Sequence, residues 1–221
     1  MQLRILTMDP GTANFAVAIM LISYVDGVFR FKCEGTAMLD KRRLLKDMKT
    51  MRASLLTFEE YVQPLFSNGK FDAFVAERFQ ARGGKGPTIE SVNCMLGRMA
   101  GMSTDAEIPD ADFVTAGVWK NEFNRNGDLK EMYEDHKELR RDKTRPHIQI
   151  HQLDACLLGI YRACKILGIK PFSFITSRDK EAKLLKILDS APELRCLAEP
   201  LPTLRRAPKK KRKAKAKKCA A

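Results

Sequence analysis

The feature that most constrains the fold is a pair of apolar segments joined by Asp26-Gly27. Residues 15–24 are apolar nearly throughout, which is typical of a strand buried on both faces. Asp-Gly between two such segments is a strong hairpin signal, and residues 28–33 continue as a further strand. Residues 3–8 form another short apolar strand before them. The chain is therefore predicted to begin with a three-stranded antiparallel meander.

Helical and strand patterns alternate after this meander. Apolar residues recur at helical spacing over residues 44–66, 88–102 and 148–167, with Thr88 as a predicted N-cap and Gly168 closing the last helix. Short strands are predicted at 71–76 and 113–115, and a helical turn at 118–123. This order predicts an α/β fold, a mixed five-stranded sheet of an antiparallel meander plus two parallel strands flanked by helices.

The net charge of +13 is concentrated at the C-terminus. Residues 205–221 contain ten basic residues, no acidic residue and no aromatic residue, so this tail is predicted to be disordered. We interpret it as an arm that neutralises nucleic-acid phosphates, chiefly through Lys209, Lys210, Lys211, Arg212 and Lys213. A targeting role stays open, because PKKKRK resembles a nuclear-import signal. Residues 169–204 are predicted to be an extension with one helix.

The six cysteines include no C-x-x-C pair, which favours free thiols in a reducing compartment over a disulfide framework or a zinc site. The sequence shows no signal peptide and no apolar run of the roughly 18 residues that a transmembrane helix needs. A soluble intracellular protein is therefore expected. The cytoplasm of a phage-infected bacterium is the favoured location, with a nucleus or organelle left open.

Acidic residues occur at three distant places where the predicted fold could bring them together. Asp9 and Glu77 each end a predicted strand, and His151 and Asp154 share a helix face at i, i+3 spacing. Clustered carboxylates repel one another, and a divalent metal offsets that repulsion. On a basic chain, a metal cluster of this kind points to phosphodiester hydrolysis.

These residues resemble those of the RuvC-type Holliday-junction resolvases, a family of the ribonuclease-H-like superfamily. The resemblance covers about residues 3–168, and the predicted nuclease domain spans residues 1–168. In that family Asp-Pro-Gly ends the first strand, as Asp9-Pro10-Gly11 does here, and a Glu ends the fourth, as Glu77 does in FVAERF. A final helix has Asp or His followed three residues later by Asp-Ala, as His151 and Asp154-Ala155 are here.

The resemblance implies a homodimer that cuts four-way DNA junctions with two Mg²⁺ or Mn²⁺ ions at each site. The implied metal ligands are Asp9, Glu77, Asp154 and His151, although His151 could instead be a surface histidine bonded to Asp154. Other candidates are a lysine near the scissile phosphate, an aromatic residue that stacks on a base, and phosphate-binding basic residues: Lys120, Phe79, Arg78, Arg82 and Lys85. Trp119 is expected in the core.

Three points stay open at this stage. The same catalytic core could act on flaps, forks and other branched DNA, or the chain could be a non-catalytic structural DNA-binding protein that uses its basic tail. The long C-terminal extension suggests a viral or phage enzyme, or an organellar one. The small residues of the helix at 88–102 could form the dimer surface or ordinary core packing.

Removal of residues 205–221 should weaken binding to all DNA. It should also lower the slope of log affinity against log salt concentration, because about one counterion is released for each phosphate contact. Fluorescence anisotropy with junction and duplex DNA at several salt concentrations measures both quantities. An unchanged salt slope would contradict the phosphate-neutralising role of the tail.

Overall fold

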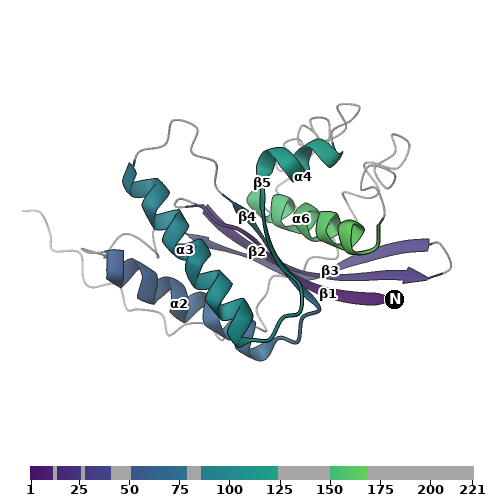
Figure 1. The fold of residues 1–221 in the computed structure, drawn as a ribbon, viewed down its shortest axis with the longest axis horizontal. Coiled ribbons are helices and arrows are strands. Elements are labelled where there is room, and N and C mark those ends of the chain that lie inside the picture. Colours follow the sequence, from purple (N-terminus) through teal and green to yellow (C-terminus); the bar gives the residue numbers. More distant parts are fainter. Residues whose placement is uncertain (12–13, 26–27, 41–50, 79–85, 124–149, 169–221) are drawn as a thin grey trace, which may run out of the picture.

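A computed structural model of the chain describes residues 1–11, 14–25, 28–40, 51–78, 86–123 and 150–168. It contains a five-stranded sheet in the order β3-β2-β1-β4-β5 (Figure 1). β1 pairs antiparallel with β2 and β2 with β3, whereas β4 lies parallel to both β1 and β5. The predicted mixed sheet is confirmed, and its strands are β1 (Gln2–Asp9), β2 (Asn14–Val25), β3 (Val28–Asp40), β4 (Ala73–Arg78) and β5 (Ala111–Thr115).

Helices cover both faces of the sheet and make a three-layered structure (Figure 1). One face packs against α2 (Met51–Asn68) and α3 (Gly86–Asp105), and the other against α4 (Ala116–Phe123) and α6 (Ile150–Ile166). α3 begins two residues before Thr88, so the predicted N-cap is wrong. Gly168 follows α6 with φ of 69°, a conformation that glycine adopts without strain, as predicted. None of the helices in the described ranges is long and apolar enough to cross a membrane.

The third strand is longer than predicted. β3 continues past Cys33 to Asp40, with a bulge at Glu34, an extra residue at which the register shifts between Ile19 and Met20 of β2. After this bulge the Thr36 hydroxyl donates a hydrogen bond of 2.7 Å to the carbonyl of Val17. The bulge interrupts the alternation of apolar residues on which the shorter prediction relied. Predictions for residues 41–50, 124–149 and 169–221 lie outside the described residues.

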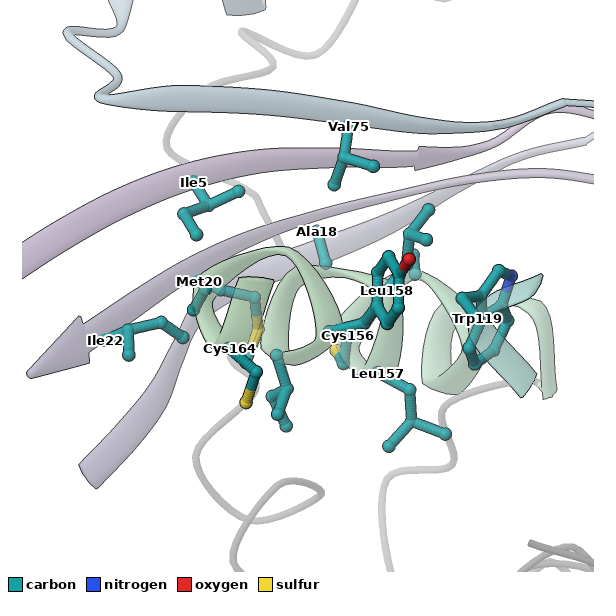
Figure 2. Close-up of a cluster of buried hydrophobic side chains, with 14 of the residues drawn as sticks. Ile5, Ala18, Met20, Ile22, Val75, Trp119, Cys156, Leu157, Leu158 and Cys164 are labelled. Carbon is teal, nitrogen blue, oxygen red and sulfur yellow. The ribbon is translucent and has the colours of Figure 1, made fainter. Parts of the chain in front are cut away.

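Alternation along β1 and β4 divides the core into two clusters. Leu3, Ile5, Ala73 and Val75 pack on the α6 side. The α2 and α3 side has the alternate residues Leu6, Met8, Phe74 and Ala76. Figure 2 shows side chains of the sheet facing α6, among them Ile5, Ala18, Met20 and Val75. The same alternation places Asp9 and Glu77, at the ends of the two strands, on the α6 side.

α6 packs very closely against the sheet. A Cβ atom on Gly159 would lie 2.7 Å from Cγ of Met20 and 2.8 Å from Cγ2 of Thr7, which is closer than side chains pack. The Thr7 hydroxyl donates a hydrogen bond of 2.8 Å to the carbonyl of Ala155. Farther along the helix, Arg162 forms ion pairs with Asp110 and Asp112 next to and within β5. These contacts fix the helix on the sheet.

Gly159→Ala should therefore destabilise the protein by about 1–3 kcal/mol, because the new methyl group overpacks the contact between α6 and the sheet. Gly97→Ala is the matched control, since a Cβ there has nothing within 4 Å. That substitution, in an exposed part of α3, should add roughly 0.5–1 kcal/mol of stability. Urea denaturation of both variants measures the two free energies of unfolding. Equal effects in the two helices would contradict the close packing of α6.

Candidate active site

Two acidic side chains lie at the ends of neighbouring parallel strands. Thr7 pairs with Val75 and Met8 with Ala76, so Asp9 and Glu77 occupy the next position on β1 and β4. The strands are parallel, and both residues therefore lie at the same edge of the sheet. Asp9 is 8% exposed and Glu77 is partly buried. The strand order and the alternation of side chains together bring these carboxylates onto one face at one edge.

α6 adds a third carboxylate and a histidine to this edge. His151 and Asp154 lie one turn apart near the start of the helix, where it covers the ends of β1 and β4. Asp154 is only 7% exposed, and the next residue, Ala155, accepts the hydrogen bond from Thr7. Thr7 is two residues before Asp9 on the same face of β1. This hydrogen bond therefore holds the segment of β1 that contains Asp9 next to the segment of α6 that contains Asp154.

Each of the three carboxylates is bonded to a donor from elsewhere in the chain. Nδ1 of His151 lies 2.8 Å from Oδ2 of Asp9. From α4, the ammonium of Lys120 donates to Oδ2 of Asp154 and the indole N–H of Trp119 donates to Oε2 of Glu77, and both hydrogen bonds are 2.8 Å long. Histidine therefore pairs with Asp9, and α4 provides the partners of the other two acids.

The pKa of Glu77 reflects the negative charge gathered at this edge of the sheet. Burial and the nearby carboxylates of Asp9 and Asp154 together raise the pKa of Glu77 to about 7, against the opposing effects of Trp119 and Lys120. A buried carboxyl next to another carboxylate is costly to ionise. The charged form of Glu77 is thus disfavoured in this environment.

The pKa values of the two basic partners are raised as well, which for a base favours the charged form. The hydrogen bond to Asp9 raises the pKa of His151, because it stabilises the charged imidazolium. Burial lowers the pKa of Lys120, but the charge and hydrogen bond of Asp154 outweigh burial and raise it overall. Protonated His151 and Lys120 therefore neutralise part of the negative charge of the cluster.

The chemistry of this group fits a hard divalent cation. Carboxylate oxygens are the ligands that Mg²⁺ and Mn²⁺ prefer, and a cation would offset the repulsion seen at Glu77. In the described part of the chain, however, no three Asp, Glu, His or Cys side chains are arranged to hold one metal ion. Trp119, Lys120 and His151 are bonded to the carboxylates instead. The carboxylate oxygens that could bind a cation are present, and side chains of the protein are bonded to some of them.

The other predicted site residues fall into two groups. Arg78 is the last residue of β4 and is exposed directly after Glu77, where it can reach solvent. The remaining candidates lie outside the described residues, so their predicted contacts with DNA stay predictions: Phe79, Arg82, Lys85, Lys209, Lys210, Lys211, Arg212 and Lys213.

The sequence did not indicate that Trp119 contacts the acidic residues of the candidate site. It was expected in the core, and its full burial confirms that expectation. Its hydrogen bond to Glu77 was not predicted, because the two residues are 42 positions apart. The available signal was its position immediately before Lys120 in the helical turn that follows β5.

The fold is similar to that of two solved RuvC structures. A RuvC structure from Thermus thermophilus matches with a TM-score of 0.56 and 14% identity, covering 76% of this chain and 97% of that one. RuvC of the same organism in complex with a Holliday junction substrate matches with a TM-score of 0.53 at the same identity and the same coverage. The yeast mitochondrial Holliday junction resolvase Ydc2 matches at 10% identity, with a TM-score of 0.45, over 84% of this chain and 82% of that one.

No protein-family model matches the chain, and no curated protein matches it. At 14% identity, the likeness to the two Thermus structures shows a shared fold. The chain thus shares its mixed sheet and flanking helices with the fold of these RuvC structures.

Glu77→Gln should stabilise the metal-free protein increasingly as the pH rises from 5 to about 7. In the folded state Glu77 keeps its proton up to about pH 7, whereas its usual value is 4.5, so the folded state binds more protons between these values. The stability of the wild type then falls with rising pH across this window. The gain in the variant should level off above pH 7 at no more than about 3 kcal/mol.

Urea denaturation in EDTA at several pH values measures this difference. Glu90→Gln, on the exposed surface of α3, is the matched control for replacing a glutamate by its amide. A difference between Glu77→Gln and wild type that does not change with pH would contradict the raised pKa of Glu77.

Proposed function

For a chain with the fold of RuvC, we propose the function of a divalent-metal-dependent endonuclease that resolves four-way DNA junctions. The observation that supports this most directly is the convergence of Asp9, Glu77 and Asp154 at one edge of the sheet. These residues come from three distant segments, and two of them are buried. A merely structural role would not require three acids to share one face at the cost of mutual repulsion.

The three carboxylates are the proposed ligands of two Mg²⁺ or Mn²⁺ ions, with His151 as a further ligand in its neutral form. When bound, such ions activate a water molecule and stabilise the leaving 3′-oxygen of a phosphodiester. The protein contributes the fixed positions of the ligands. Asp9 and Glu77 are held by the pairing of β1 with β4, and Asp154 by the packing of α6.

Lys120 and His151 are also proposed to compensate the negative charge of the carboxylates, and Lys120 to contact DNA. Both are bonded to carboxylates in the metal-free arrangement, where they offset negative charge. Lys120 is about one-third exposed, so its ammonium can also meet a phosphate of bound DNA. Arg78 is exposed at the end of β4 and is proposed as a further phosphate contact.

A homodimer is proposed because a four-way junction has two-fold symmetry and two strands must be cut. Gly97 and Gly101 lie on the exposed face of α3, and a Cβ on either one would have nothing within 4 Å. The opposite face of α3, with Val92, Met95 and Met99, is buried against the sheet. α3 therefore has a smooth exposed face that a second copy could approach. The nuclease domain is proposed to span residues 1–168, with an extension at 169–204 and the basic tail at 205–221.

The direct test is a nicking assay on an immobile four-way junction and a matched linear duplex, with Mg²⁺, Mn²⁺ or EDTA. Wild-type protein should cut two opposite strands of the junction in the presence of metal and leave the duplex intact. Asp154→Asn should lose at least about 100-fold in rate, because one ligand oxygen is lost, yet should still bind the junction. Asp105→Asn, at the exposed end of α3, is the matched control and should cut at the wild-type rate.

Other outcomes would redirect the proposal. Equal cleavage of flaps, forks and junctions would favour a broader branched-DNA nuclease with the same metal centre. Tight junction binding with no cleavage in either metal would favour a structural DNA-binding protein. That second outcome would overturn the enzymatic proposal.

A further inference from the structure

The only tryptophan of the chain is buried next to the candidate active site. Trp119 lies on α4, which follows β5 directly, and its ring is part of the core on the α6 side of the sheet. Figure 2 shows it at one end of this cluster, beside α6. A buried indole N–H needs an acceptor, and here that acceptor is Oε2 of Glu77 at 2.8 Å.

The indole ring is fixed by contacts on several sides. Phe123, one helical turn later, meets it edge to face with ring centroids 6.1 Å apart and an angle of 83° between the planes. The ammonium of Lys120 lies 4.9 Å from the centroid of the indole ring. Because this ring has little freedom to move, the direction of its N–H bond is fixed as well.

Consecutive residues of α4 thus bond to two candidate ligands that come from different elements. Trp119 donates to Glu77 at the end of β4, and Lys120 donates to Asp154 on α6. The Lys120 bond is an ion pair, which a cation or phosphate can replace. The Trp119 donor is an uncharged N–H, and its partly buried bond uses one of the two oxygens of Glu77.

We propose that Trp119 is a positioning residue for metal binding. Its N–H holds Oε2 of Glu77 and leaves Oε1 for the cation. This inference rests on the proposed function, in which Glu77 is a metal ligand. Hydrogen bonds that orient a ligand commonly contribute 10–100-fold to metal affinity, because they fix the ligand before the metal binds.

The test replaces the indole N–H alone. Biosynthetic incorporation of 3-benzothienylalanine puts sulfur in place of that N–H and keeps the bicyclic shape, and with a single tryptophan no other position changes. Electron paramagnetic resonance of free Mn²⁺ should show 10–100-fold weaker binding to this protein. Protein containing 5-fluorotryptophan keeps the N–H and should bind like the wild type. Wild-type affinity in the benzothienyl protein would overturn the proposal.

Two further measurements separate this inference from the proposed function. In the metal-free protein, the single indole N–H resonance should move upfield on Glu77→Ala, because its acceptor is lost; an unchanged resonance would overturn the hydrogen bond. If Glu77→Gln weakens Mn²⁺ binding and the benzothienyl protein does not, only the role of Trp119 fails. If the wild type binds no Mn²⁺, the proposed function fails together with this inference.

Discussion

The contact between α6 and the sheet is the constraint on which the candidate site depends. Asp154 is on this helix, whereas Asp9 and Glu77 are on the strands, so their separation is set by how closely the helix packs. Gly159 permits that approach, because any side chain there would collide with Met20 and Thr7. The bond from Thr7 to the carbonyl of Ala155 then fixes the helix along its axis. The packing of the core thus determines the geometry of the proposed metal ligands.

The protein offsets the charge that this packing brings together. Among the described residues, each carboxylate is bonded to a different side chain, and two of these partners, Lys120 and His151, are bases whose pKa values are raised. Within the ranges that the structure describes, the hydrogen-bond donor to Glu77 is the uncharged indole N–H of Trp119, and burial together with the neighbouring carboxylates raises the pKa of Glu77 to about 7. Metal binding should therefore release a proton near neutral pH, since a ligand carboxylate must be ionised.

Sequence periodicity could predict the fold and the convergence of the acids. The period of two along the strands gives the faces of Asp9 and Glu77, and the i, i+3 spacing gives that of His151 and Asp154. The bulge at Glu34 was not predictable, because an extra residue interrupts the alternation without a turn signal. The pairing of His151 with Asp9, in place of Asp154, depends on the depth at which α6 packs. The Trp119 bond to Glu77 depends on tertiary packing between α4 and β4, which local patterns do not encode.

The central claim is that Asp9, Glu77 and Asp154 form one metal-binding centre. Anomalous diffraction from crystals soaked in Mn²⁺ tests it most directly, because Mn²⁺ scatters anomalously and carboxylates do not. The account predicts anomalous peaks among these three side chains, within coordination distance of their oxygens, with the ammonium of Lys120 displaced from Asp154. Crystals that show no peak there, with the Lys120 and Trp119 bonds unchanged, would contradict it.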